Sequence, residues 1–402
     1  MSGVNFLDKL LDGVVVEWVE VGLLISPQRG RRLVKSQLEE VGSYAVYQNS
    51  MRPLGYYHES NTQAGACFVI VAGAAGEIGF SDAAFWAADD VYFFPESKAV
   101  NSKYLYHFLL TKQHEISSQV RRASIPRLSI AAVEKLEIPI PCPDSPQKSL
   151  EIQAEIVRIL EAFTELTAEL TAELTARKKQ YNYYRDQLLR FEEGDVEWKT
   201  LGEIGTWHGG GTPSKSRNDF WENGTIPWVS PKDMGNPIVE TTEDYITEDA
   251  IQKSSTKLVP ANSIAIVVRS SILDKVLPSA LIPVPVTLNQ DMKAVIPHSD
   301  ILPSYVAHMV RSRGDDILRA ARKTGGSVAS IESKKLFSFR IPVPCLEEQR
   351  RIVNILDKFD TLANSITEGL PREIELRQKQ YEYYRDLLLS FPKPEAPTVA
   401  QA

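Results

Sequence analysis

The sequence lacks the short motifs that assign most enzymes to a class. It has no Walker A loop, no GxGxxG after a predicted strand, no HExxH and no paired cysteine or histidine spacing that would hold zinc. Its nearest approach to a phosphate loop, residues 209–215 (GGGTPSK), has no glycine before the lysine. The six histidines are scattered, and each is interpreted as a surface or hydrogen-bonded side chain. These absences predict a chain without a catalytic centre or metal site.

Cysteines and long apolar runs are also scarce. The three cysteines, Cys67, Cys142 and Cys345, are odd in number and widely spaced, so we expect neither a disulfide framework nor a zinc site and interpret them as buried small residues. No run of about 18 apolar residues could span a bilayer. The amino terminus has no signal-peptide pattern. The sequence therefore predicts a cytoplasmic protein, and its 402 residues predict two or three domains.

What the sequence does contain is an internal repeat. Residues 177–191 (RKKQYNYYRDQLLRF) recur as residues 377–391 (RQKQYEYYRDLLLSF) with eleven of fifteen positions identical. Three shorter segments recur in the same order: VEW at 16–18 and 196–198, IPxPC at 138–142 and 341–345, and a helical segment at 153–163 and 349–359. The bodies between them hardly resemble each other. The repeat predicts two related halves that share one scaffold and recognise two different things.

The repeated regions show the clearest helical pattern. Apolar residues separated by steps of three and four run from Ile152 to Phe191, the pattern of a heptad seam, and the second copy, Glu347 to Phe391, follows the same pattern. In the second copy Gly369-Leu370-Pro371 predicts a kink or short break. We expect two long helices that pack antiparallel and hold the bodies at opposite ends.

The bodies are predicted to be mixed. Residues 66–71 and 263–268 are apolar runs of strand length, whereas residues 102–113 and 303–312 have helical patterns. The predicted fold class is therefore α+β, with no strand order assigned.

Basic residues cluster at matching places although the formal net charge is −7. Residues 111–135 contain five Lys/Arg and two acids, and residues 311–335 contain seven and three. A solvated face would explain one such cluster, but the recurrence in two dissimilar bodies favours DNA binding, which needs positive charge for phosphates and polar side chains for bases. The candidate DNA-binding residues are Arg29, Arg31, Arg32, Gln48, Asn49, Arg121, Arg122, Arg127, Ser214, Lys215, Lys232, Arg269, Asn289, Gln290, Lys323, Thr324 and Ser327.

Several motifs together resemble one family. They are the YNYYRDQLL and YEYYRDLLL helices, the Thr-Ala-Glu-Leu units at 167–170 and 171–174, and residues 209–234 (GGGTPSKSRNDFWENGTIPWVSPKDM). With the order of the repeats they resemble the specificity subunit of a type I restriction-modification system, most closely the IC class, over essentially the whole chain.

This resemblance implies two target-recognition domains separated by two long antiparallel conserved helices, with a circular pseudo-twofold arrangement. It places the first recognition domain at residues 1–148, a central spacer helix at 149–193, the second recognition domain at 194–345 and a carboxy-terminal helix at 346–391. The Pro- and Ala-rich composition of residues 392–402 predicts a disordered tail. The implied target is asymmetric, bipartite double-stranded DNA, with one half-site for each domain.

The resemblance also implies partners and cofactors. Two modification subunits would bind S-adenosylmethionine and methylate adenine, and restriction subunits would use ATP and Mg²⁺, while this chain would hold no cofactor. Tyrosine and arginine are favoured at interface centres, so the repeated helices are expected to dock the modification subunits. The candidate interface residues are Tyr181, Tyr183, Tyr184 and Arg185, with their copies Tyr381, Tyr383, Tyr384 and Arg385.

Two other classes remain open on the sequence. A non-DNA adaptor with coiled-coil helices would explain the helices but not the matched basic clusters. A stand-alone nuclease or methyltransferase would need an acidic metal cluster or a cofactor loop, and neither motif is found in the sequence.

Overall fold

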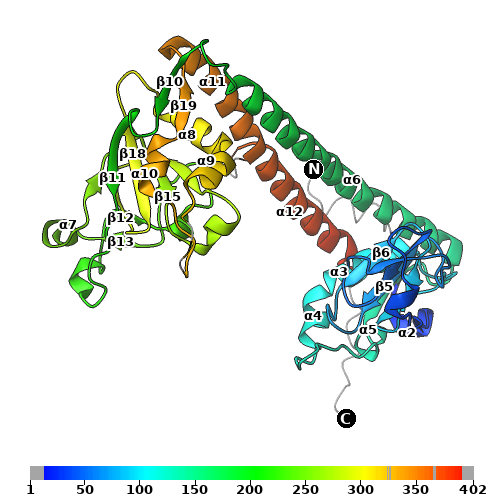
Figure 1. The fold of residues 1–402 in the computed structure, drawn as a ribbon. Helices are drawn as coiled ribbons and strands as arrows, with labels where there is room; N and C mark the ends of the chain where they lie inside the picture. The colour runs from blue at the N-terminus through cyan, green and yellow to red at the C-terminus, as the bar shows by residue number, and fades with distance from the viewer. Residues whose placement is uncertain (1–12, 324, 326, 365–367, 392–402) are drawn as a thin grey trace. The chain divides into compact units, whose positions relative to one another are not determined.

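The computed structural model describes residues 13–323, 325, 327–364 and 368–391. The chain forms two compact units (Figure 1): unit 1 contains Met1–Thr171 and Glu373–Ala402, and unit 2 contains Ala172–Arg372. Each unit therefore combines one of the two bodies with helical segments from both halves of the sequence. The predicted disordered tail, residues 392–402, lies outside the described residues.

The body of unit 1 contains two small sheets. The first has the antiparallel order β2-β8-β5-β6, formed by Gln28–Arg29, Val91–Phe93, Ala66–Ile70 and Ile78–Ser81. The second has the order β4-β3-β7, formed by Gly55–Tyr57, Tyr44–Tyr47 and Trp86–Ala87. All five residues of β5 are buried, as expected for a continuous apolar strand with both faces covered. Helix α3 (Ser102–Thr111) packs against β5 and β6. Smaller helices complete the body: α2 (Val21–Leu24), η1 (Lys35–Gln37), α4 (Gln113–Ser118) and α5 (Ala131–Glu134).

The body of unit 2 repeats this topology and adds a fourth strand to its second sheet. Its first sheet has the antiparallel order β11-β18-β15-β16, formed by Gly205–Gly209, Met292–Pro297, Ser263–Val267 and Ser279–Ile282. Its second has the order β13-β12-β17-β14, formed by Tyr245–Ile246, Ile226–Val229, Val286–Leu288 and Leu258–Val259. The helices are η2 (Asn218–Phe220), η3 (Pro231–Asp233), α7 (Glu248–Lys253), η4 (Ser271–Asp274), α8 (Pro303–Ser312), α9 (Gly314–Ala321) and α10 (Ser333–Ser338). The predicted α+β class is confirmed, and the bodies share a strand order despite their dissimilar sequences.

The recurring short segments pair with each other in each unit. Strand β1 (Val16–Glu20) pairs with β9 (Glu137–Pro141), and β10 (Glu197–Thr200) pairs with β19 (Arg340–Val343), both antiparallel. Trp18 lies opposite Pro139, and Trp198 lies opposite Pro342. The VEW and IPxP segments therefore form the same two-stranded ribbon twice, which confirms the predicted common scaffold.

Buried polar side chains attach this ribbon to the helices in the same way in both units. The Tyr104 hydroxyl donates to the Pro139 carbonyl at 2.8 Å, and the Tyr305 hydroxyl donates to the Pro342 carbonyl at 2.9 Å. The fully buried amide of Gln153 likewise accepts from the backbone N–H of Asn101 and donates to the Ala99 carbonyl. Gln349 makes the equivalent bonds in unit 2, to Leu302 and Asp300. A buried amide without these partners would be costly, so both glutamines fix the start of their helix.

The predicted long helices are present. Helix α6 spans Pro146–Leu188, and the second copy forms α11 (Leu346–Asn364) and α12 (Leu370–Leu389). The predicted break before α12 is confirmed at Gly369, whose φ of +93° favours glycine and where a Cβ would lie 2.5 Å from the Thr361 carbonyl oxygen.

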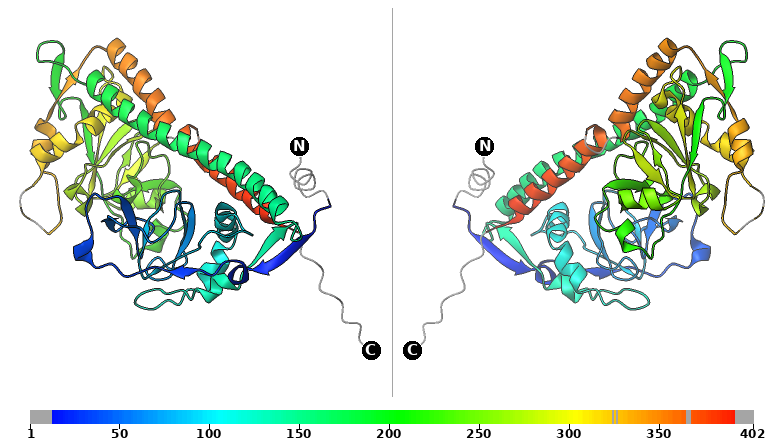
Figure 2. Two further views of the ribbon diagram at one scale, coloured as in Figure 1. Left: turned by 90° about the vertical axis from the view of Figure 1, so that its right-hand side faces the viewer. Right: turned by 90° about the vertical axis from the view of Figure 1, so that its left-hand side faces the viewer.

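Both helices of the second copy lie beside α6 (Figure 2). In unit 1 the ring of Phe163 stacks on Tyr384 with centroids 5.2 Å apart, and in unit 2 the ring of Tyr184 stacks on Phe359 at 5.5 Å. The partners therefore follow α6 in the opposite chain direction, which is the order of an antiparallel pair.

Buried histidines join the bodies to the helices. His107, fully buried on α3, lies with Nδ1 2.8 Å from the Tyr381 hydroxyl and with Nε2 3.4 Å from Glu161. Burial lowers the pKa of His107 to about 4, although Glu161 favours the protonated form. In unit 2, His308 lies with Nε2 2.7 Å from Asp357. Each of these histidines is hydrogen-bonded through one ring nitrogen, as predicted, but the other nitrogen, His107 Nε2 or His308 Nδ1, is buried with no hydrogen-bond partner among the described residues.

The cysteine prediction is only partly correct. Cys67 is buried in β5, Cys142 is half-buried and Cys345 is exposed, and all three are free thiols. The prediction of burial is wrong for Cys345 because it lies where the chain leaves β19 for α11.

Within the described residues, no helix is long and apolar enough to cross a membrane. The described part of the chain also contains no cluster of three His, Cys, Asp or Glu residues with metal-binding geometry.

Candidate nucleic-acid interface

In unit 1 three of the predicted arginines lie on one hairpin loop, residues 121–127. Arg121 and Arg127 close it through reciprocal backbone hydrogen bonds of 2.9 and 3.1 Å. The next residue, Leu128, is buried and donates its N–H to the Val71 carbonyl at the end of β5. Arg121, Arg122 and Arg127 are all exposed. The loop therefore holds three cations at the end of the central strand.

The loop that follows β5 links this hairpin to other loops, because the Gly73 N–H donates to the Pro126 carbonyl at 3.1 Å. The backbone N–H of Ala74 donates to the Asn49 carbonyl after β3, and that of Arg31 donates to the Ala87 carbonyl at the end of β7, both at 2.9 Å. One surface depression is lined by residues that include Arg32, Lys35, Gln48 and Asn49. The structure thus brings together predicted residues from three separate parts of the first body.

Unit 2 builds the same arrangement from different side chains. Its hairpin, of which residues 323, 325 and 327–330 are described, is closed by the Lys323 N–H donating to the Ser330 carbonyl at 2.9 Å. Ile331, buried like Leu128, donates to the Val268 carbonyl at the end of β15 at 2.8 Å. A depression beside the loop is lined by Asp274, Arg322, Lys323 and Ser327, among others. Thr324, also predicted to bind DNA, lies outside the described residues.

Gly30, which was not among the predicted residues, and Gly210, predicted only as part of residues 209–215, allow neighbouring loops to approach each other. A Cβ on Gly30 would lie 2.3 Å from the carbonyl oxygens of Ala87 and Ala88, and one on Gly210 would lie 1.8 Å from that of Asn289. Side chains cannot occupy such positions without moving the backbone. A glycine after the first strand of each body is the sequence signal for this close contact.

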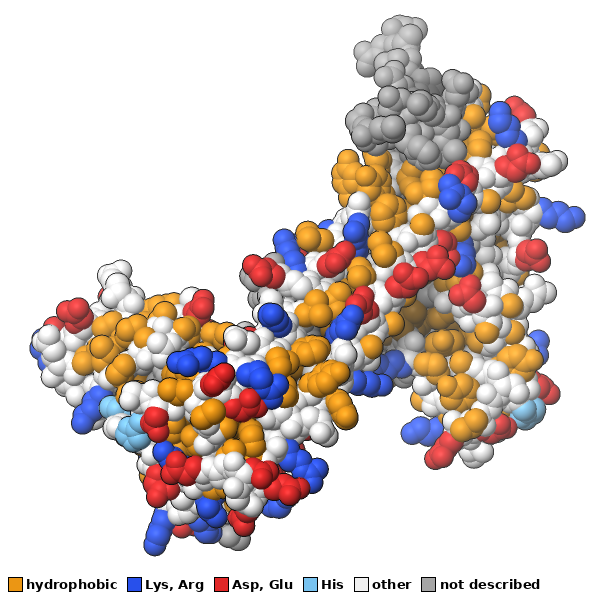
Figure 3. Space-filling model, turned by 90° about the horizontal axis from the view of Figure 1, so that it is seen from above, with side chains coloured by type: hydrophobic (Ala, Val, Ile, Leu, Met, Phe, Trp, Pro, Cys, Tyr) orange, Lys and Arg blue, Asp and Glu red, His pale blue; other side chains and the backbone are white. Residues whose placement is uncertain are grey.

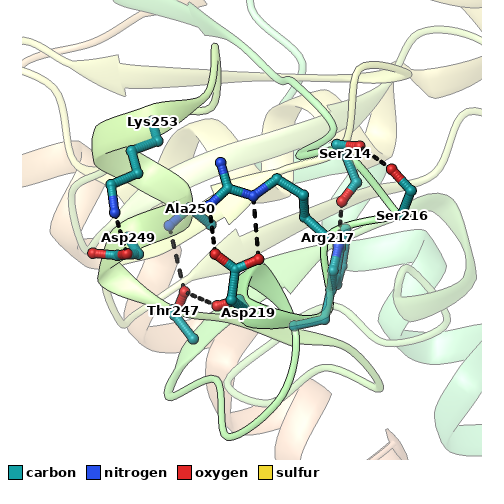
Figure 4. Close-up of polar contacts among 9 residues, drawn as sticks. Ser214, Ser216, Arg217, Asp219, Thr247, Asp249, Ala250 and Lys253 are labelled. Atoms are coloured by element: carbon teal, nitrogen blue, oxygen red, sulfur yellow. Dashed lines mark hydrogen bonds and ion pairs between the residues drawn. The ribbon is translucent and has the colours of Figure 1, made fainter.

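The second body also has a lobe of its own, shown in Figure 4. Arg217 forms two hydrogen bonds with Asp219, the Thr247 hydroxyl donates to the Asp219 carbonyl at 2.9 Å, and the Trp221 indole donates to the Ser214 carbonyl at 3.1 Å. The lobe has a small apolar core: Phe220, Trp228, Ile246 and Ala250. It fixes the loop that exposes Ser214 and Lys215.

The Lys and Arg residues predicted to bind DNA differ in whether they form ion pairs with nearby Asp or Glu residues. Among the described residues, Arg31, Arg32, Arg121, Arg122 and Arg127 form no ion pair. Arg29 donates its Nε to the Asp89 carbonyl at 2.8 Å. The charges of these residues are therefore available to an anion.

In unit 2 some of the predicted Lys and Arg residues lie close to carboxylates. Lys232 lies 2.6 Å from Glu243 and 3.1 Å from Asp244, hydrogen bonds that raise its pKa. Arg269 lies 4.0 Å from Asp291, whereas Lys215 and Lys323 have no ion pair within the described part of the chain. Lys232 is thus the least available of the predicted phosphate contacts.

Two predicted amide side chains have different positions. Asn289 is buried and accepts a hydrogen bond from the Asp291 N–H at 2.7 Å, a position that argues against direct contact with DNA. Gln290 is exposed and hydrogen-bonds to Thr212 and Asp291. Gln290 therefore remains a candidate for base recognition.

The repeated tyrosines also separate into two groups. Tyr181 is buried, Tyr381 bonds to His107, and the Tyr184 and Tyr384 rings stack on phenylalanines in the helix pair. Arg185 and Arg385 each bond to the next residue, an aspartate. Only Tyr183 and Tyr383, each 62% exposed, present most of their surface to solvent.

The face drawn in Figure 3 has no extended area of one charge, because basic and acidic side chains are intermixed with hydrophobic ones. On α6 and α11 the charges pair within the helix, as in Arg158 with Glu155 and Arg351 with Glu348.

The family model and the related sequences all match type I restriction specificity subunits. The family model described as type I restriction modification DNA specificity domain matches residues 15–177 and again residues 193–376. The type I restriction enzyme EcoR124I/EcoR124II specificity subunit of Escherichia coli is 59% identical over 98% of this chain and 99% of its own. A putative type I restriction enzyme specificity subunit of Haemophilus influenzae is 33% identical over 96% of this chain and 98% of its own.

Solved structures show the same fold. The type I restriction-modification S subunit from M. genitalium matches with a TM-score of 0.59 and 17% identity, covering 95% of this chain and 98% of that chain. A chain from a study of assembly and conformational transition of the type I R-M system matches with a TM-score of 0.62 and 16% identity, covering 93% and 97%. Because the family model matches both halves, the chain belongs to the family of type I restriction-modification specificity subunits.

Proposed function

We propose that each body of this DNA specificity subunit binds one half of an asymmetric, bipartite double-stranded target. The observation that supports this is the pair of equivalent loop clusters, which share hydrogen bonds to the ends of β5 and β15 but differ in their side chains. Phosphate contacts position a protein on DNA, whereas base-edge contacts give specificity. Two equivalent scaffolds with unlike side chains would therefore recognise unlike half-sites.

As a type I specificity subunit, the chain has DNA and the modification and restriction subunits as partners. We further propose two modification subunits in each complex, with S-adenosylmethionine bound there and ATP and Mg²⁺ bound by the restriction subunits. This chain would then be a non-catalytic component that holds no cofactor and works in the bacterial cytoplasm. The catalytic groups would be supplied by the partners.

Exchange of one body tests whether each body recognises its own half-site. Residues 196–345 enclose both β10 and β19, so their replacement by the matching segment of a relative keeps the β10–β19 ribbon intact. We expect the hybrid complex to change one half of its methylated sequence and to keep the other, as measured by sequencing of methylated adenines in host DNA.

The reciprocal hybrid, with residues 16–142 replaced, is the matched control and should change only the other half. A hybrid that altered both half-sites would contradict separate recognition. A chain that supported no sequence-specific methylation would contradict the proposed function itself.

The exposed tyrosines of the repeated helices provide a second test. Tyr183→Ala with Tyr383→Ala should weaken assembly with the modification subunits about 10- to 100-fold, since aromatic side chains dominate many interfaces. The chain should stay folded because both residues are largely exposed. Native mass measurement of the complex over a concentration series reports the stoichiometry. Tyr56→Ala, an exposed tyrosine of β4, is the control, and unchanged assembly of the double variant would refute the interface.

A further inference from the structure

Both hairpin loops expose a branched aliphatic side chain at the same position. Ile125 is 54% exposed and Val328 is 39% exposed. Each lies three residues before the buried residue, Leu128 or Ile331, that anchors its hairpin to the central strand. The two side chains are therefore equivalent by backbone geometry, although the bodies differ in sequence.

A second pair of backbone hydrogen bonds also places Ile125 and Val328 at equivalent positions. The Gly73 N–H donates to the Pro126 carbonyl at 3.1 Å, and the Ser270 N–H donates to the Ala329 carbonyl at 3.0 Å. The residue before each aliphatic side chain is an exposed serine, Ser124 or Ser327. A serine followed by a β-branched aliphatic residue thus recurs at one structural position in both bodies.

The surroundings of these side chains are basic. Arg121, Arg122 and Arg127 flank Ile125, Lys323 precedes Val328 in its loop, and all four cations are exposed without an ion pair among the described residues. A single exposed aliphatic residue needs no explanation. The same exposure at equivalent positions, next to unpaired cations, indicates an anionic partner that also offers an apolar group.

DNA has both properties. An aliphatic side chain cannot hydrogen-bond to a phosphate or to a base edge, but the C5-methyl group of thymine lies in the major groove and accepts apolar contact. We propose that Ile125 and Val328 each contact a thymine methyl group, one in each half of the target, with the adjacent serine hydroxyl at the neighbouring base edge. This inference rests on the proposed function of the bodies.

Uracil substitution tests it because uracil lacks only that methyl group. The complex of this chain with its modification subunits is titrated with target duplexes in which each thymine of the half-sites is replaced in turn by uracil. We expect one position in each half-site at which the native complex binds about three- to fivefold more weakly, the effect of one buried methyl group. Ile125→Ala should remove this sensitivity in one half-site only, and Val328→Ala in the other only.

Leu23→Ala and Ile238→Ala, which shorten exposed aliphatic residues outside the hairpins, are the matched controls and should keep both sensitivities. Melting temperatures of all variants establish that they are folded. Specific binding with the same uracil sensitivity in native and Ile125→Ala complexes would overturn the inference but leave the proposed function intact. Weaker subunit assembly in Ile125→Ala, with the uracil pattern of the remaining complex unchanged, would also overturn it by assigning the Ile125 side chain to a protein contact. Absence of any sequence-specific binding by the native complex would instead refute the proposed function.

Discussion

Insertion of a third Thr-Ala-Glu-Leu unit after Leu174 is expected to abolish recognition of the original target. The new target should have one more base pair in the gap, the stretch between the two half-sites that is not recognised. The boundary between the two compact units falls between Thr171 and Ala172, within the existing repeats. Four residues lengthen a helix by about 6 Å and add about 40° beyond a full turn. Residues 164–180 of α6 include no buried side chain, so an insertion there leaves the core of each unit intact.

Methylated-adenine sequencing of a strain with the insertion measures the new gap. Thr167→Ala with Thr171→Ala provides a control without a length change. Both hydroxyls donate to carbonyls of their own helix, at 2.8 Å, so the control should keep the original gap. An insertion variant that methylated the old target, or that changed the bases of either half-site, would show that these residues do not set the spacing.

Removal of the three hairpin cations should have the second large effect. Arg121→Gln, Arg122→Gln and Arg127→Gln together are expected to weaken DNA binding by the assembled complex about 10²–10³-fold at 0.1 M salt, because each phosphate contact contributes about 0.9 to the salt slope. The slope of log affinity against log salt should fall by about two to three units. Filter binding over a salt series measures both quantities.

A control with the same change in net charge separates local contact from overall charge. Arg158→Gln, Arg177→Gln and Arg351→Gln remove three cations that are each paired with a glutamate on their own helix. For this variant the slope of log affinity against log salt should be nearly that of the native complex. Equal losses in the two triple variants would mean that the hairpin makes no specific phosphate contact.

The sequence predicted the parts of the fold that depend on local pattern. Heptad spacing predicted α6 and α11, Gly369 predicted the break before α12, and apolar runs of strand length predicted β5 and β15. The recurrence of residues 177–191 at 377–391 predicted the two-fold repetition and, through the family resemblance, the type I specificity subunit. Periodicity and repetition are properties of neighbouring residues, so they can be recognised without knowledge of the fold.

Only the tertiary structure decided which predicted residues share one surface. Arg31 and Arg127 are far apart in sequence, yet backbone hydrogen bonds to β7 and β5 bring their loops to one end of the sheets. Burial likewise separates Asn289 from Gln290, its neighbour in sequence, and Tyr181 from Tyr183. The equivalence of Ile125 and Val328 was also hidden, because backbone hydrogen bonds define it and backbone geometry is shared by sequences that differ in nearly every side chain.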